Sequence, residues 1–232
     1  MSETPTSLEI PRGERILVLP LGSWEQHGPH LPLDTDSVII SRVVVDSLAH
    51  SSINSKDFLC APLLPITASD EHAGFVGGLS TGTEGLVNAV VAICRSAQSW
   101  AAGIIIVNGH GGNYDALQNI TSALTFEGIV HSVWSLPSYP DGDMHAGHTE
   151  TSIMMHIAPT SVRTEFIADL QPTSATVDQL RHAGVHEVSP SGVIGNPLTA
   201  TSEHGRDVLN LYVNSLVQRL QSCSATWLHS ST

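Results

Sequence analysis

The feature that most constrains the fold is the wholly apolar segment 104–107 (Ile-Ile-Ile-Val), which stands between two longer stretches with helical spacing of apolar residues. A strand without polar alternation is typical of a sheet that is buried on both faces. Further strands are predicted at 16–21, 58–64 and 129–136, and helices at 38–49, 84–102, 113–126, 149–157 and 202–220. This alternation predicts an α/β fold, a three-layer α/β/α domain with a mostly parallel central sheet.

The length and composition favour one domain. A chain of 232 residues with 41% hydrophobic residues is long enough and apolar enough to bury a substantial core. We place the domain at 13–221, between a flexible N-terminus at 1–12 and a poorly ordered tail at 222–232. Asp36 or Ser37 is expected to cap the first helix, and Asn113 the helix that follows it at 113–126.

The charge balance argues against nucleic acid and membranes as partners. Nine Lys and Arg against 22 Asp and Glu give a net charge of −13, which repels phosphate groups. No apolar run reaches the ~18 residues of a membrane span, and the first residues lack the pattern of a secretory signal. The three cysteines are far apart and suggest no disulfide framework, so we expect a reduced, cytoplasmic setting.

Metal-ligating residue types cluster directly after the predicted strand 16–21. Glu25, His27 and Asp36 lie in a segment whose prolines prevent a helix. In α/β proteins the chemistry usually lies at the carboxyl ends of strands. The alternative is a polar loop with a helix cap at its end. His30 and Asp34 share this segment and are expected to orient the ligands.

A second motif, Asn-Gly-His-Gly-Gly-Asn at 108–113, follows the apolar segment 104–107. It places His110 at the end of another strand, and Gly111 and Gly112 let backbone N–H groups approach a ligand closely. A phosphate-binding loop is the competing interpretation, but the Lys and Ser or Thr of a P-loop are missing. A metal ligand is therefore the favoured role of His110.

A third motif spans 143–152. Glu150 falls in the first turn of a predicted helix, where the helix dipole favours the charged carboxylate that a metal requires. The alternative role for Glu150 is a helix cap. His145 lies five residues earlier and could face the same cleft. His72, in a Ser-Asp-Glu-His run after the second strand, is a candidate substrate contact or part of an exposed polar loop.

Together the motifs supply five nitrogen or oxygen ligands, which are more than one tetrahedral zinc needs. The five residues are Glu25, His27, Asp36, His110 and Glu150. Such a set suits two divalent ions ~3.5–4 Å apart, which can make hydroxide available at neutral pH. Oxygen and imidazole ligands without thiolate fit Zn, Mn or Fe(II) and do not choose among them.

With these motifs the chain resembles the creatininase (creatinine amidohydrolase) family. The resemblance rests on 21–36, on 108–113, on His-Ala-Gly at 145–147 and on Glu-Thr-Ser at 150–152, with weaker similarity at 69–75 and 192–197. It implies a creatininase-like α/β/α fold, two divalent metals, hydrolysis of C–N bonds in cyclic or linear amides, and hexamers built from dimers.

The resemblance also implies roles for individual residues. Glu25 and His110 resemble ligands of one ion and His27 a ligand of the other, with Asp36 as the bridge. His145 resembles the residue that protonates the leaving nitrogen. Creatininase itself has a glutamate ligand where this chain has Gly112, and Glu150 is the expected replacement.

The departure at Gly112 argues against creatinine as the substrate. The motif at 145–152, taken together with the motif at 188–195, resembles instead those of the family members encoded in mycofactocin gene clusters. Those enzymes trim a C-terminal Val-Tyr dipeptide from a modified precursor peptide. One alternative is an amidohydrolase that opens or deformylates a small cyclic amide. A second alternative is a metal-binding scaffold without turnover.

Overall fold

The structure is a computed structural model that describes residues 4–138 and 143–229, with only the backbone of Arg181. Its strands are β1 (Ile16–Leu21), β2 (Phe58–Cys60), β3 (Gly103–Asn108) and β4 (His131–Ser135). Its α-helices are α1 (Thr35–Leu48), α2 (Gly82–Ala97), α3 (Tyr114–Phe126), α4 (His148–Ile157), α5 (Val177–Val188) and α6 (Ser202–Trp227). Short 3-10 turns include η3 (Asp70–His72) and η4 (Gly111–Asn113).

The four strands form one parallel sheet in the order β2-β1-β3-β4. The central strands β1 and β3 pair from Ile16 opposite Gly103 to Leu21 opposite Asn108, and all of their residues are buried. This confirms the burial expected from the apolar segment 104–107. Because parallel strands end at the same edge of the sheet, the loops after β1 and β3 meet there.

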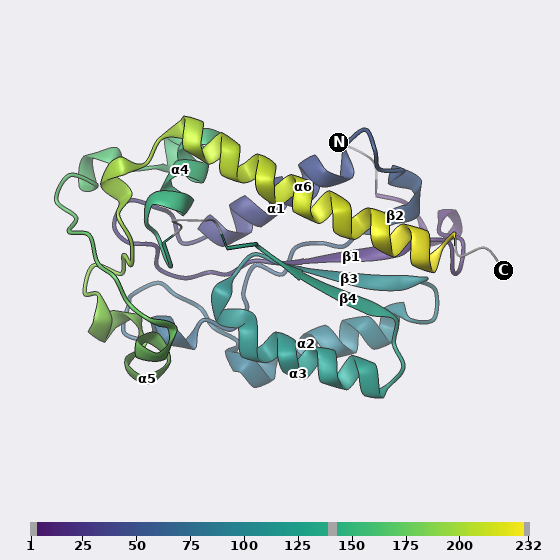
Figure 1. The fold of residues 1–232 in the computed structure, drawn as a ribbon. Coiled ribbons are helices and arrows are strands. Elements are labelled where there is room, and N and C mark those ends of the chain that lie inside the picture. Colours follow the sequence, from purple (N-terminus) through teal and green to yellow (C-terminus); the bar gives the residue numbers. More distant parts are fainter. Residues whose placement is uncertain (1–3, 139–142, 230–232) are drawn as a thin grey trace.

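Helices cover both faces of the sheet, as Figure 1 shows. Successive side chains of a strand point to opposite faces, so Ile16 and Val18 pack with α1, α4 and α6, whereas Leu17 and Leu19 pack with α2 and α3. The predicted three-layer α/β/α fold is confirmed. The helix α5 lies apart from both layers, at one end of the sheet, where it packs on η3.

Several element boundaries differ from the prediction; the helix predicted at 84–102, for example, ends at Ala97. The first helix begins at Thr35, after Asp34, so Asp36 and Ser37 lie inside its first turn and do not cap it. The strand β2 ends at Cys60, although Leu64 still pairs with Leu21 as an isolated bridge. The last helix, α6, continues through Trp227 into the segment that we assigned to the tail.

The extension of α6 has a packing reason. Cys223 is buried in the core, and Ser224 Oγ donates a hydrogen bond of 2.5 Å to Asp57 Oδ2. Trp227 packs over Gly103, where a Cβ would lie 2.4 Å from its ring. Residues 1–3 and 230–232 of the two terminal segments lie outside the described residues.

The helix α5 was not predicted at all. Its sequence is largely polar, and Gly184, with φ of +76°, interrupts its helical geometry. A capping box at Thr176, in which the Thr176 side chain accepts a hydrogen bond from the backbone N–H of Gln179, marks its start. None of the helices in the described part of the chain combines the length and apolar character needed to cross a bilayer.

Candidate metal centre and active site

Predicted site residues from four segments lie together at the carboxyl edge of the sheet. Two come from the loop after β1, one from the first turn of α1, one from the loop after β3 and two from the segment that opens α4. In chain order they are Glu25, His27, Asp36, His110, His145 and Glu150. Strands and helices that are far apart in the sequence thus place carboxylates and imidazoles in one cluster.

Asp36 lies at the centre of this cluster. Its Oδ1 is 3.3 Å from Nε2 of His27, and its Oδ2 is 3.0 Å from Nδ1 of His110. Ser23 Oγ donates a 2.7 Å hydrogen bond to Oδ2 and so fixes the rotation of the carboxylate. The two carboxylate oxygens thus face two different imidazoles.

Backbone carbonyl groups orient both imidazoles. His27 Nδ1 lies 3.2 Å from the carbonyl oxygen of Glu25, and His110 Nε2 lies 2.9 Å from that of Ala68. Because a carbonyl oxygen only accepts hydrogen bonds, each of these nitrogens carries a proton. The opposite nitrogen, which faces Asp36 in both residues, is the one that can bind a metal.

Neighbouring carboxylates raise the pKa values of the two imidazoles that face Asp36. Burial disfavours a charge on His27, but Asp36 outweighs this effect and raises the pKa of His27 to about 9. Burial also opposes the charge on His110, whereas Glu25 and Asp36 favour it and raise the pKa well above its ordinary value. Metal ligands must be deprotonated, so a divalent cation would displace these protons.

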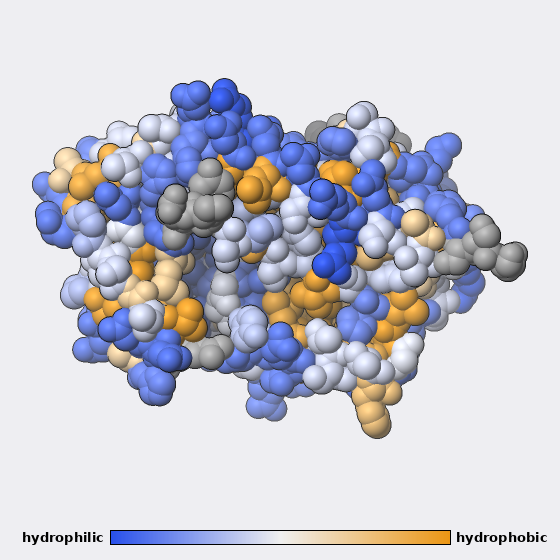
Figure 2. All heavy atoms as spheres, viewed as in Figure 1, coloured by the Kyte–Doolittle hydropathy of each residue, from blue (hydrophilic) through white to orange (hydrophobic). Residues whose placement is uncertain are grey.

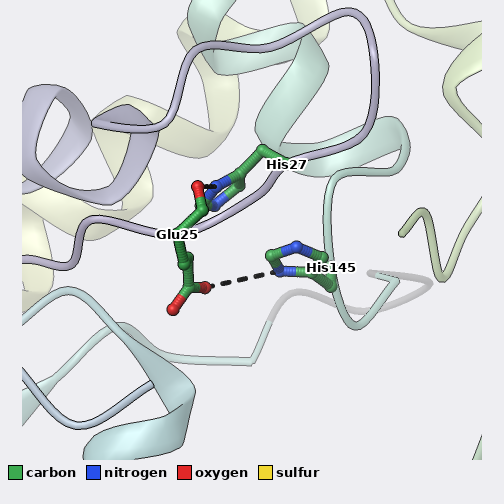
Figure 3. A group of neighbouring side chains, drawn as sticks. All are labelled: Glu25, His27 and His145. Atoms are coloured by element: carbon green, nitrogen blue, oxygen red, sulfur yellow. Dashed lines mark hydrogen bonds and ion pairs between the residues drawn. The ribbon is translucent and has the colours of Figure 1, made fainter. Parts of the chain in front are cut away.

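The carboxylate of Glu25 is fully buried, and neither oxygen has a hydrogen-bond partner among the described residues. Nε2 of His72 and Nε2 of His110 lie 3.2 and 3.1 Å from its oxygens, within ion-pair distance but without hydrogen-bond geometry. Figure 3 shows the carboxylate directed toward His145, whose Nδ1 is 3.8 Å away. A buried carboxylate without hydrogen bonds is costly, and a cation would satisfy it.

Two groups of potential ligands share Asp36. One consists of Glu25, Asp36 and His110, the other of His27, Asp36 and Glu150, and within each group the ligand atoms lie within 4.8 Å of one another. The residues therefore fit a metal centre with mixed oxygen and imidazole ligands. Two further groups, Glu25 with His27 and His145 and Glu25 with Glu71 and His72, overlap with these around Glu25.

His145 and Glu150 differ from the other members in their protonation. Burial, followed by the charges of His27 and His72, holds the pKa of His145 well below its ordinary value, so the ring is neutral. Burial raises the pKa of Glu150 to about 7, against the attraction of His27. The effect of the helix dipole, which we expected to keep this carboxylate charged, is thus outweighed by burial.

The remaining predicted residues lie around the cluster. His72 is part of it through Glu25, and Gly111 and Gly112 line the cavity above it. His30 is buried outside the ligand groups, with Nε2 2.8 Å from Thr151 Oγ1. Asp34 is the N-cap residue of α1 and makes no side-chain capping hydrogen bond.

Two residues in the cluster were given no definite role by the sequence motifs. Glu71, in η3, places Oε1 3.3 Å from His110 Nε2 and fills the space beside Gly112. The Ser-Asp-Glu-His run carried a signal for it, but an exposed loop was an equal alternative. Gln26 lies between the two first ligands and is 6% exposed; only its position next to Glu25 could have pointed to it.

The cluster opens into a cavity of about 760 Å³. Its polar side is formed by Asp36, Glu71, His72, His110, His145 and Glu150, and its apolar side by Val177, Leu180 and Val185 of α5. None of the described residues that line it is Lys or Arg. Figure 2 shows apolar residues where Figure 1 places α5, with the surface hollowed beside them.

Comparisons with known proteins agree with this geometry. The family model for creatinine amidohydrolase (creatininase) matches residues 3–220. The mycofactocin precursor peptide peptidase of Mycobacterium tuberculosis is 41% identical over 230 residues, 96% of this chain and 90% of the relative. The creatinine amidohydrolase of Pseudomonas putida is 23% identical over 241 residues, 91% of each chain.

Solved structures support the same fold. A crystal structure of creatinine amidohydrolase superimposes with a TM-score of 0.70 at 20% sequence identity, covering 95% of this chain and 92% of the other. The resemblance inferred from the motifs is therefore confirmed over nearly the whole chain. Relatives named as a peptidase, a deformylase and an amidohydrolase all belong to one class of enzyme. This chain is a metal-dependent hydrolase of the creatininase (creatinine amidohydrolase) family.

Proposed function

We propose that this hydrolase is a dinuclear metal peptidase that removes a C-terminal Val-Tyr dipeptide from a mycofactocin precursor peptide. The observation that carries the proposal is the 41% identity with the mycobacterial peptidase over 96% of this chain. The sharing of Asp36 between two ligand groups supports it, because a bridged pair of ions is a common catalyst of hydrolysis.

The described side chains suggest how two ions would be held. Glu25, Asp36 and His110 would hold one ion, and His27, Asp36 and Glu150 the other. When bound, the pair would lower the pKa of a water molecule and polarise the scissile carbonyl. Zn, Mn and Fe(II) are the candidates, since the ligands are imidazoles and carboxylates without a thiolate.

His145 would move the proton. The ring is neutral in the described site, and its Nδ1 faces Glu25 and the cavity. Nδ1 can therefore accept a proton from the attacking water and deliver it to the departing nitrogen, which a hydrolysed amide requires. The backbone N–H groups of Gly111 and Gly112 line the same cavity and are proposed to stabilise the oxyanion.

The cavity suits the end of a peptide with apolar side chains. Its volume of about 760 Å³ lies within the range of small-molecule sites, roughly 300–1,000 Å³. Val177, Leu180 and Val185 form an apolar wall of this cavity. Such a wall would receive the valine or tyrosine side chain while the amide bond lies over the cluster.

A second candidate keeps the chemistry and changes the substrate. A deformylase of Methanothermus fervidus that acts on a formylamino-pyrimidine is 27% identical over 225 residues, and the Pseudomonas putida relative acts on creatinine. An amidohydrolase for a small cyclic amide or formamide would use the same cluster. The higher identity to the peptidase favours the peptide.

The test is mass spectrometry of a synthetic precursor peptide that ends in Val-Tyr. The metal-replete chain should release the intact dipeptide, and a chelator should abolish the release. Creatinine and formamides, incubated in parallel, should remain unchanged. Hydrolysis of one of these small amides without cleavage of the peptide would replace the first proposal by the second.

Two further features belong to the same proposal. The family resemblance favours a homo-oligomer of hexamer type, which the mass of the assembled particle would reveal. A reduced, cytoplasmic setting is proposed because Cys60, Cys94 and Cys223 are all free thiols, and two of them are buried.

A further inference from the structure

Gln26 is a neutral side chain that contacts two imidazoles of the cluster, those of His72 and His145. It lies between Glu25 and His27, and its amide nitrogen is 2.8 Å from His72 Nδ1 and 3.0 Å from His145 Nε2. We propose that Gln26 determines which ring nitrogen carries the proton in His72 and in His145, and is thereby a positioning residue of the site. The proposal deepens the proposed function and rests on it for its catalytic consequence.

The orientation of the Gln26 amide is fixed by two backbone groups. The N–H of Gly28 donates a 2.9 Å hydrogen bond to Oε1, and a backbone N–H can only donate. On the other side, Nε2 donates to the carbonyl oxygen of Gly192 at 3.2 Å, and a carbonyl can only accept. Both contacts require the same assignment of oxygen and nitrogen, so the amide cannot be flipped.

This orientation fixes the tautomer of His72. Because Gln26 Nε2 is a donor, His72 Nδ1 must be the unprotonated nitrogen that accepts from it. The other ring nitrogen, Nε2, is then the one that carries a proton, and it lies 3.2 Å from Glu25 Oε1. His72 therefore presents an N–H, and not a lone pair, to Glu25.

The backbone of Gln26 fixes the tautomer of His145. His145 Nε2 is 2.8 Å from the carbonyl oxygen of Gln26, so an unprotonated Nε2 would bring two acceptors into contact. Nε2 therefore carries the proton and donates it to this carbonyl, the shorter of its two contacts, so its 3.0 Å approach to the Gln26 amide nitrogen is not a hydrogen bond. The two amide protons of Gln26 remain for His72 and Gly192, and every group has a partner.

The two tautomers present different groups to Glu25. His72 offers it an N–H, whereas Nδ1 of His145, 3.8 Å from Glu25 Oε1, is a free lone pair directed at the cavity. His72 cannot then ligate a third ion between Glu25 and Glu71. His145 starts each reaction as a base, with the nitrogen nearest the cluster ready to take a proton.

This arrangement gives a structural role to the segment 188–195, which has no role in the proposed function. A Cβ on Gly192 would lie 1.7 Å from Gln26 Oε1, and one on Gly28 would lie 2.6 Å from Val193. Both glycines also have positive φ, +79° and +68°. The segment 188–195 thus closes over the Gln26 amide, and its backbone holds that amide in place.

Solid-state NMR of histidine-labelled, zinc-loaded protein tests the proposal directly. The ¹⁵N shifts distinguish protonated from unprotonated ring nitrogens, and His72→Gln and His145→Gln variants assign the signals. In the unchanged protein both rings should carry a single proton on Nε2. In Gln26→Met, the proton of His72 should no longer be confined to Nε2. His145 should keep its proton on Nε2, because a backbone carbonyl accepts it. Gln118→Met, on the exposed face of α3, is the control and should change neither.

A proton on Nδ1 of either ring in the unchanged protein would overturn the proposal. So would a His72 signal that is the same in Gln26→Met as in the control. Both readouts are independent of turnover, so they stand even if the Val-Tyr peptide is not cleaved. If the peptide is cleaved, Gln26→Met should lower kcat several-fold while the zinc content equals that of the control.

Discussion

Replacing Gly112 by alanine tests the packing of the metal centre with a single methyl group. A Cβ at this position would lie 1.8 Å from Glu71 Oε1 and 2.4 Å from His110 Nε2, far inside van der Waals contact. Gly111→Ala is a matched control in the same 3-10 turn, because a Cβ there meets nothing within 4 Å. The φ angle is not positive at either glycine, so backbone strain does not enter the comparison.

The expected difference in stability follows from these contacts. Both substitutions reduce the freedom of the unfolded chain, and this gain of ~0.4–1 kcal/mol cancels between them. What remains is overpacking, which costs about 1–3 kcal/mol. The Glu71 carboxylate is 26% exposed and can turn aside, whereas the His110 side chain is 5% exposed and is held by Ala68, so the ring carries the cost. For a chain of this length, the metal-free Gly112→Ala variant should unfold roughly 2–12 °C below the control.

The same displacement should weaken metal binding, because His110 would no longer present its nitrogen correctly. A disturbance of ligand orientation typically costs about 10–100-fold in affinity. Competition with a chromogenic chelator measures this loss, and thermal unfolding in EDTA measures the stability. Equal melting temperatures and equal zinc affinities for the two variants would refute the reasoning, since they would mean that Glu71 and His110 do not crowd Gly112.

Three other outcomes are expected. His145→Ala should retain its metal, measured by elemental analysis, and lose about 10²–10⁴-fold in kcat; full activity would exclude the acid–base role. The free energy of unfolding of the metal-free protein, measured by urea denaturation, should fall as pH rises from about 6.5 to 9. His27 has a pKa of about 9 in the folded state and ~6.5 in the unfolded state, so the unfolded state releases its proton first. With zinc bound this loss should disappear, since the metal takes the place of the proton. Val177→Asp, in the apolar wall, should raise KM for the Val-Tyr peptide with little change in kcat, whereas Val45→Asp, at a somewhat more exposed valine on α1, should leave both constants unchanged.

The fold could be predicted because its strongest signals are local. The segment 104–107 has no polar residue, and its burial on both faces requires helices above and below. The ligand motifs follow β1 and β3 directly, and parallel pairing brings the ends of these strands together. That Glu25 and His110 lie close could therefore be expected without knowing any side-chain conformation.

The rest depends on contacts between distant segments. The Gln26 side chain is oriented by the carbonyl oxygen of Gly192, which lies 166 residues away in the sequence. The composition of neither segment predicts this contact. Glu71 enters the site because Gly112 leaves room for it, which is a property of the space between two loops. The position of Asp36 inside the helix, and not before it, follows from Thr35 Oγ1, which donates to the carbonyl oxygen of Pro32 and helps to start the helix one turn early.

The two halves of the site rest on supports of different local stability. Glu25, His27 and His110 follow the buried central strands, whose amide hydrogens should exchange only at a free energy close to that of global unfolding. His145 is tied to Ile194 by a pair of backbone hydrogen bonds in a loop, and α5 packs on the short turn η3. These outer segments can open at a lower free energy than the sheet. The apolar wall and the proton-transfer residue can therefore separate to admit a peptide chain while the ligand cluster stays assembled.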